Sequence, residues 1–402
     1  MKNFIFISPH FPSSYFRFVE ALKRNGFRTL GIGDAPYHEL PEGLKNALDE
    51  YYCCLDMDNF ENEVNAVKYF ENKYGHIDYL ESNNEYWLER DAKLWDIFHI
   101  DTGVGYKDIQ DYQHKSLMKK HYKEAGAKCA DYIIIDTFEN ALKFAQKVGY
   151  PIFIKPDYGV GASGDFKIIS EEDLKHFFEV KDPYTVYICE QYVTGNIISF
   201  DGIADSNSNV VFATSNFFPP SIADVVQGKK DVSYYTLPQV PEDLMEIGSR
   251  VIKAFKVKKR FFHLEFFRLT QDVPNLGEVG DIVALETNMR PAGGYTPDLI
   301  NFANSLDCYQ VYADVIAYDE NRSTNNYPHY YAICSSRRDA ASYVNSDEQI
   351  IEKYRNCLCF YGRYPQIFTA AMGDRFFMAK FETLEEALSF KEYVEQRLWV
   401  KK

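Results

Sequence analysis

The sequence predicts an α/β chain with an N-terminal domain built on a parallel β-sheet. A two-lobed α+β module and a small C-terminal α+β subdomain follow. The first third alternates apolar strands with amphipathic helices, the middle has two strands around a glycine-rich loop, and the end mixes strands with helices. A chain of 402 residues is long enough for two or three packed units. We predict parts with these bounds: 1–105, 106–188, 189–317 and 318–402.

The N-terminal domain begins with a βαβ unit. Residues 3–8 predict an apolar strand, residues 13–27 an amphipathic helix that stops at Gly26, and residues 28–34 a second strand. A further strand at 76–82, followed by an amphipathic helix, extends the parallel sheet. The dinucleotide fingerprint G-x-G-x-x-G does not follow the first strand, which argues against a dinucleotide site there.

The two-lobed module begins with a lysine-rich helical stretch, a short strand and a second helix. Ser170, followed by three acidic residues, predicts the N-cap of the next helix. The chain then becomes rich in strands that predict antiparallel ribbons, interrupted by a long helix at 241–256. In the C-terminal part we expect two helices and three strands, the latter at 329–336, 366–372 and 375–381.

Residues 152–166, IFIKPDYGVGASGDF, form the first candidate site. Gly159, Gly161 and Gly164 leave the backbone free to fold over an anion, and Lys155 supplies a positive charge at the end of the preceding strand. No G-K-[ST] follows, so this is not a Walker loop. A glycine-rich turn without a ligand is an equally good interpretation of this segment alone.

Two later strands carry polar side chains on one face each. Side chains alternate along a strand, so Glu286, Asn288 and Arg290 share one face and His263 and Glu265 share another. Carboxylate and amide oxygens suit Mg²⁺, and an arginine can neutralise a reacting phosphoryl group or an oxyanion. Exposed charges on an edge strand are the alternative, but apolar neighbours indicate a central strand.

Composition and charge exclude several classes. The net charge is −15, whereas a nucleic-acid surface needs a basic footprint. No apolar run is long enough for a membrane helix, and the start of the chain becomes polar too soon for a signal peptide. The eight cysteines are scattered without a C-x-x-C pair, which indicates free thiols. We therefore expect a cytoplasmic protein that binds neither nucleic acid nor membrane.

The order of these motifs resembles the ATP-grasp superfamily. The series is Lys115 in HKSLMKKHYKEAGAK, Lys155 in the glycine-rich segment, Glu190 in ICEQYVTG, Glu265 in FHLEFF and ETNMRP at 286–291. It is most similar to the carboxylate–amine ligase branch, which includes biotin carboxylase, carbamoyl phosphate synthase and L-amino acid ligases. The resemblance implies that the two-lobed module is an ATP-grasp module.

The resemblance also implies roles for residues that match. Lys115 and Lys155 would contact ATP phosphates, and the loop would close over them through Gly159, Gly161, Ser163 and Gly164. The hinge that contacts adenine would consist of Glu190, Gln191 and Val193. Mg²⁺, with Mn²⁺ as an alternative, would be held by Glu265, Glu286 and Asn288. Arg290, with Lys155, would act on the reacting groups. A solvated Lys115 and a Glu190 that only ends a strand are the structural alternatives.

The sequence departs from the family pattern at two places. Many relatives have an acidic residue two positions after the hinge glycine for ribose, but this chain has Ile197, which leaves Asp201 as one candidate for that contact. The strands that carry Glu265 and Glu286 are also joined by a long connection, TQDVPNLGEVGD. A hairpin tolerates this length, because loop-closure entropy grows slowly.

The reaction implied by the resemblance joins a carboxylate to an amine. The carboxylate attacks the γ-phosphate of ATP, and the amine captures the acyl phosphate to give an amide. We expect small carboxylate and amine substrates, with an amino acid or small peptide preferred, and a homodimer as one option. The alternatives are an acid–thiol ligase, a carboxylase or a small-molecule kinase on the same fold, and an ATP-binding regulator without turnover.

Overall fold

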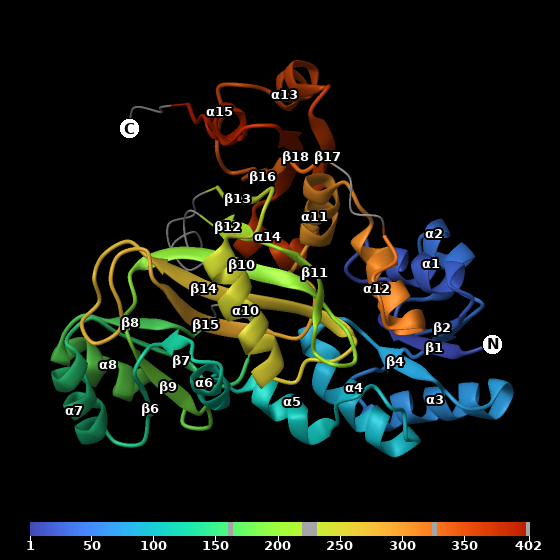
Figure 1. Cartoon of the computed structure of the whole chain (residues 1–402), viewed down its shortest axis with the longest axis horizontal. Coiled ribbons are helices and arrows are strands. Elements are labelled where there is room, and N and C mark those ends of the chain that lie inside the picture. Colours follow the sequence, from blue (N-terminus) through green and yellow to red (C-terminus); the bar gives the residue numbers. More distant parts are fainter. Residues whose placement is uncertain (160–163, 219–230, 324–327, 399–402) are drawn as a thin grey trace.

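A computed structural model of the chain describes residues 1–159, 164–218, 231–323 and 328–398 (Figure 1). In these residues the strands form a parallel four-stranded sheet, a ten-stranded sheet and a second four-stranded sheet. The N-terminal domain lies at the right of Figure 1, the lobe with α7 and α8 at the lower left, and the C-terminal part at the top, above β10, β14 and β15. The predicted α/β fold class, with its N-terminal parallel sheet, is confirmed.

The N-terminal sheet has the strand order β3-β2-β1-β4 and is parallel throughout. Every residue of β1 is buried, because both faces of the sheet are covered. Ile5 and Ile7 pack into one core with α3 and α4, and Phe4 and Phe6 pack into another with α1, α2 and α12. Its elements are β1 (Asn3–Ile7), α1 (Phe16–Arg24), β2 (Arg28–Gly33), η1 (Tyr37–Glu39), α2 (Glu42–Ala47), β3 (Glu50–Cys53), α3 (Phe60–Tyr74), β4 (Tyr79–Glu81) and α4 (Glu85–Phe98).

The small lobe is an antiparallel sheet of order β6-β9-β7-β8, covered by α7 and α8. Ser170 caps α8 as predicted, since its side chain accepts a hydrogen bond from Asp173 N. The chain from 106 to 191 forms α5 (Tyr106–Gln113), α6 (Lys115–Glu124), β5 (Lys128–Cys129), β6 (Tyr132–Ile134), α7 (Phe138–Val148), β7 (Ile152–Pro156), β8 (Phe166–Ile168), α8 (Glu171–Val180) and β9 (Tyr187–Gln191).

The large sheet follows the order β17-β18-β16-β13-β12-β10-β14-β15-β5, with β11 beside β10. The antiparallel ribbons and the long helix predicted here are present as β10–β11 and α10. The elements are β10 (Gly195–Ala204), β11 (Val210–Thr214), β12 (Asn216–Phe218), β13 (Ser233–Thr236), α10 (Glu242–Ala254), β14 (Arg260–Leu269), β15 (Ile282–Asn288), α11 (Thr296–Asn304) and α12 (Cys308–Tyr318).

The C-terminal part extends this large sheet, because β16 pairs with β13. One prediction is wrong here: residues 366–372 form a helix, not a strand. Pro365 precedes the segment, and its alanines and methionine favour a helix. The elements are β16 (Tyr331–Arg337), α13 (Asp347–Tyr354), β17 (Leu358–Arg363), α14 (Gln366–Met372), β18 (Arg375–Phe381) and α15 (Leu384–Glu395). The four-part division of the chain stays a prediction.

Candidate active site

Three parts of the chain bring polar side chains to one place. The small lobe contributes Lys155 and Glu190, and the adjoining helix α6 contributes Lys115. The large sheet contributes the polar faces of β14 and β15, and α4 of the N-terminal domain contributes its first residue, Glu85. The charges of these groups influence one another across the junction, so residues far apart in the sequence form one electrostatic cluster.

Glu190 is the centre of a buried ionic cluster. Its carboxylate forms an ion pair with Lys155 Nζ at 2.8 Å and a second one with Lys119. Lys155 and Glu190 meet because β7 and β9 are antiparallel neighbours, with Glu190 opposite Phe153 and therefore diagonal to Lys155 on one face. Sequence reasoning did not select Lys119, which is one of four lysines on α6.

The pKa of Glu190 reflects its attraction to the two lysines. Burial alone raises the pKa of a carboxyl group, but the charges of Lys119 and Lys155 outweigh that effect and lower the pKa to about 2. Burial likewise disfavours charged Lys155, yet Glu190 and Glu286 raise its pKa above the ordinary value. Both groups are therefore fully ionised at neutral pH.

Lys115 links the glycine-rich loop to the strand that carries Glu286. Its Nζ donates a hydrogen bond to the Gly159 carbonyl at 3.2 Å and lies 3.4 Å from Glu286 Oε1. Asp157 fixes the start of α6, because its Oδ1 accepts from Ser116 N at 2.7 Å. Gly164, with φ +86°, ends the loop in the left-handed conformation that glycine favours. Gly161 and Ser163 lie outside the described residues.

The polar faces of β14 and β15 meet as the alternation predicts. Glu265 lies directly opposite Glu286 in the antiparallel ladder, and His263 lies opposite Asn288. Glu286 and Glu265 side chains are about a quarter exposed, whereas Asn288 is buried. Two carboxylates and an amide oxygen therefore face the same side of neighbouring strands.

His263 connects Glu265 to the interior of the sheet. Its Nδ1 and Asp201 Oδ1 are 2.6 Å apart, and its Nε2 and Glu265 Oε1 are 3.1 Å apart. Burial lowers the pKa of the imidazole, but the two carboxylates outweigh burial and raise it to about 9. Asp201, the candidate for ribose contact, is buried and bonds His263 and Asn216.

These side chains fit a magnesium ion in part. In the described residues no three His, Cys, Asp or Glu side chains form a group that could hold a metal ion by themselves. Glu265, Glu286 and Asn288 lie on one face of the paired strands β14 and β15, and each carries an oxygen that can bind a metal ion. Mg²⁺ commonly keeps waters and takes further oxygens from nucleotide phosphates, so an incomplete protein set is compatible with this ion.

Arg290 lies just beyond β15 and reaches the N-terminal domain. Its Nε is 3.5 Å from Glu85 Oε2, and its Nη2 donates to Asn288 Oδ1 at 3.4 Å. Burial raises the pKa of Glu85, and the charge of Arg290 lowers it in part. Glu85 was not predicted as a site residue. Its position after the carboxyl end of β4 could have indicated it, because ligands of parallel sheets bind at that edge.

The predicted hinge contacts the long β14–β15 connection. Gln191 Nε2 donates a hydrogen bond to the Pro274 carbonyl at 3.0 Å, and Val193 packs into a small core with Val273. The connection that departs from the family pattern therefore supports the segment between the two lobes.

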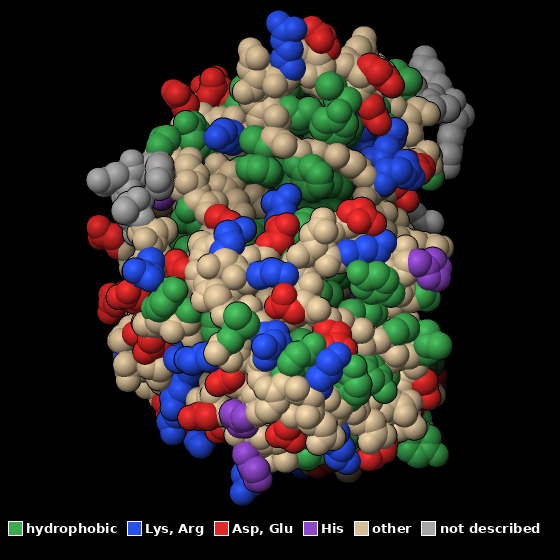
Figure 2. All heavy atoms as spheres, turned by 90° about the vertical axis from the view of Figure 1, so that its right-hand side faces the viewer, with side chains coloured by type: hydrophobic (Ala, Val, Ile, Leu, Met, Phe, Trp, Pro, Cys, Tyr) green, Lys and Arg blue, Asp and Glu red, His purple; other side chains and the backbone are tan. Residues whose placement is uncertain are grey.

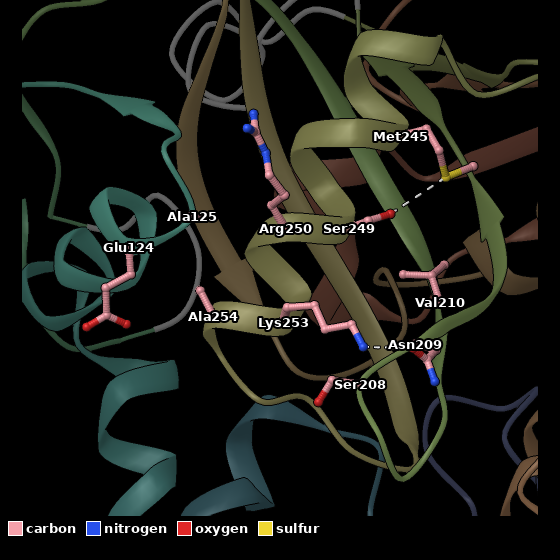
Figure 3. Close-up of a pocket in the computed structure, with 10 residues that line it drawn as sticks. All are labelled: Glu124, Ala125, Ser208, Asn209, Val210, Met245, Ser249, Arg250, Lys253 and Ala254. Atoms are coloured by element: carbon pink, nitrogen blue, oxygen red, sulfur yellow. Dashed lines mark hydrogen bonds between the residues drawn. The ribbon is translucent and has the colours of Figure 1, made fainter.

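A groove of about 710 Å³ lies away from this cluster, between the end of α6, the β10–β11 connection and α10 (Figure 3). Lys253 points across it to Asn209, whose Oδ1 accepts its hydrogen bond at 2.7 Å. The side of the molecule at the right of Figure 1 has charged side chains of both signs interspersed on its surface (Figure 2). On α1, Lys23 forms an ion pair with Asp49 and Arg24 with Asp307.

All eight cysteines are free thiols, as expected. No helix within the described ranges is both long and apolar enough to span a membrane.

Part of the chain matches a known family of ATP-binding domains. Residues 114–218 match the family model described as carbamoyl-phosphate synthase L chain, ATP binding domain. The chain is 22% identical over 261 residues to an L-arginine-specific L-amino acid ligase from Bacillus subtilis, a match that covers 63% of this chain and 61% of that relative. The chain thus spans about three fifths of the length of this curated relative.

Two solved structures have a similar fold. An L-amino acid ligase from Bacillus licheniformis superposes with a TM-score of 0.73 at 15% identity, over 100% of this chain and 99% of that chain. The biotin carboxylase domain of the 2-oxoglutarate carboxylase from Hydrogenobacter thermophilus, crystallised with MgADP and bicarbonate, gives a TM-score of 0.69 at 16% identity, over 99% and 90% of the two chains.

Proposed function

We propose that this chain, which carries an ATP-grasp domain, is an ATP-dependent ligase that joins a carboxylate to an amine. One observation carries the proposal: Lys115, Lys155 and Arg290 converge on Glu265, Glu286 and Asn288 between the two lobes and the N-terminal domain. A triphosphate that reacts with a carboxylate needs several cations in one place, and phosphoryl transfer depends mainly on position and charge.

In this proposal each side chain has a defined task. Lys115 and Lys155 bind the phosphates of ATP, while the hinge from Glu190 to Val193 receives the adenine. Arg290, located between Asn288 and Glu85, neutralises the charge that develops as a substrate carboxylate attacks the γ-phosphate. The acyl phosphate forms with release of ADP. The amine then attacks its carbonyl carbon, phosphate leaves, and the amine loses a proton as the amide forms.

Mg²⁺ or Mn²⁺ at Glu265, Glu286 and Asn288 would screen the phosphate charges. If this assignment is right, Glu286→Gln should raise the Mn²⁺ concentration needed for half-saturation by about tenfold or more, because a ligand is lost. Electron paramagnetic resonance of bound Mn²⁺ with ATP measures this directly. Glu278→Gln, in the exposed β14–β15 connection, is the control. Equal Mn²⁺ affinity in the two variants would place the metal elsewhere.

We propose that the small substrates bind on the side of the site beyond Arg290. There the loop of the N-terminal domain meets the segment after β15, since Ser13 Oγ and the Tyr295 hydroxyl are 2.8 Å apart. Phe11 of the same loop stacks on Phe368 of α14 with ring centroids 5.3 Å apart. Three parts of the chain would thus surround the acceptor region, and we propose an amino acid or small peptide as the acceptor.

We also propose a homodimer, which sedimentation analysis would test.

The reaction is tested by a screen of the twenty amino acids in pairs, with phosphate release as the readout and mass spectrometry of the products. Phosphate release that needs both partners, with a product equal to their summed mass less water, supports the amide ligase. A phosphorylated product would indicate a kinase, a requirement for coenzyme A a thiol ligase, and dependence on bicarbonate a carboxylase. Binding of ATP without turnover in any of these assays would favour a regulator.

A further inference from the structure

Two lysines share one buried carboxylate at the candidate ATP site. The side chains of Lys119, Lys155 and Glu190 are exposed by 2%, 6% and 6%. They come from three elements, α6, β7 and β9, so only the tertiary fold brings them together. The rings of Tyr122 and Tyr132 lie 6.0 Å from Lys119 Nζ and cover it.

The two lysines have different surroundings. The charges of Glu286 and Asp165 act on Lys155 in addition to Glu190, whereas two tyrosine rings lie beside Lys119. Lys119, one helical turn after Lys115, pairs with the other oxygen of Glu190. Glu190 therefore has two cationic partners, one on each carboxylate oxygen.

We propose that Lys119 is a positioning residue that keeps Glu190 paired while Lys155 turns to the phosphates of ATP. If Glu190 had Lys155 as its sole partner, phosphate binding would take that partner away and leave a buried carboxylate alone. With Lys119 in place, Lys155 leaves Glu190 at low cost and its positive charge becomes available to the nucleotide. This inference rests on the ATP site of the proposed function.

The test compares Mg·ATP with adenosine, which has no phosphate to draw Lys155 away. Isothermal titration calorimetry of Lys119→Met should show affinity for Mg·ATP reduced by about tenfold or more and affinity for adenosine changed by no more than about twofold, as expected for loss of one partner of a buried charge pair. Lys120→Met is the matched control, because Lys120 is the next residue on α6 and 73% exposed. It should leave both affinities unchanged.

A second background separates positioning from direct contact. In Glu190→Gln no carboxylate needs a partner, so adding Lys119→Met should leave the affinity for Mg·ATP unchanged or raise it. This background also removes the unpaired charge that could prevent Lys119→Met from folding by itself. Lys119→Arg should retain most of the wild-type affinity.

Several results would overturn the inference. Equal losses for Mg·ATP and adenosine in Lys119→Met would indicate a purely structural lysine. A loss that persists in the Glu190→Gln background would indicate that Lys119 itself contacts the phosphates. If the wild type binds Mg·ATP but Lys119→Met behaves like Lys120→Met, this inference fails alone, whereas a wild type without affinity for Mg·ATP would overturn the proposed function as well.

Discussion

The Glu81–Arg260 pair and the cluster of Glu190 with Lys119 and Lys155 are both buried, yet the two carboxylates differ in how many cations they contact. Arg260 Nη2 lies 2.9 Å from Glu81 Oε2, and each side chain is 1% exposed. The guanidinium also lies over the Trp95 ring, 5.1 Å from its centroid. This pair joins the N-terminal domain to β14 and gives Glu81 one cation, with the buried Asp91 carboxyl also beside it, whereas Glu190 has two cations.

The two carboxylates differ in pKa for that reason. Burial raises the pKa of Glu81, and the single charge of Arg260 offsets this effect only in part. For Glu190 burial acts in the same direction, but two lysines lower the pKa to about 2. Burial of an ion pair therefore does not identify a site. Two buried lysines on one carboxylate beside a glycine-rich loop do indicate one, because one of the lysines can change partner to an anionic ligand.

The largest effect is expected at the Glu81–Arg260 pair. Arg260→Met leaves Glu81 buried without a cation and should lower the free energy of unfolding by about 3 to 5 kcal/mol. Urea denaturation measures the change. Arg355→Met is the control, since the Arg355–Glu352 pair is 69% and 77% exposed and should contribute less than about 1 kcal/mol. Similar small losses in both variants would show that the buried pair is dispensable.

Arg290 should affect the rate but not the fold. Arg290→Met should lower the turnover number by about 10² to 10³, the usual effect of losing one group that stabilises developing charge, and change ATP affinity by less than about threefold. Phosphate-release kinetics and calorimetry measure the two quantities. Arg250→Met, in the groove beside α10, is the control. If the loss occurs mainly in ATP affinity, Arg290 is a nucleotide-binding residue instead.

Lys155 should determine how strongly nucleotide stabilises the fold. Mg·ATP at a hundredfold excess over its dissociation constant should stabilise the wild type by about 2.7 kcal/mol. Lys155→Met should remove most of this gain, because the lysine that leaves Glu190 for phosphate is missing. Thermal unfolding with and without Mg·ATP measures it, with the exposed Lys147→Met as control. If Mg·ATP does not stabilise the wild type against thermal unfolding, the proposed ATP site is contradicted.

The pH dependence of stability should have opposite signs at the two carboxylates. Glu190, with a folded pKa of about 2 against an ordinary 4.5, stabilises above pH 4.5, and about 2 kcal/mol of this is lost as the pH falls to 3. The pKa of Glu81 is raised, so its contribution falls as the pH rises above 4.5.

Urea denaturation of Glu190→Gln and Glu81→Gln from pH 3 to 7 tests both signs. The stability difference between wild type and Glu190→Gln should shrink toward low pH, whereas the wild type should lose stability relative to Glu81→Gln as the pH rises. If the stability differences for the two variants depend on pH in the same way, the predicted contrast between Glu190 and Glu81 is contradicted.

Much of the site was predictable because strand alternation is local. The face that Glu286 shares with Asn288 follows from their spacing of two, and their position opposite Glu265 and His263 follows once the two strands pair. Lys119 was not predictable, because nothing in a run of four lysines on α6 distinguishes the one that reaches Glu190. Glu85 was missed because Arg290 meets it only across domains.

The sequence by itself determined the α/β class, the parallel N-terminal sheet, the glycine-rich loop and the polar strand faces. Each depends on neighbours within a few positions, through apolar periodicity, capping residues and glycine. Only the tertiary structure decided that residues 366–372 are helical, that the C-terminal strands extend the large sheet and that Lys119 pairs with Glu190. Long-range packing sets these features, because burial and charge pairing depend on elements that meet only after folding.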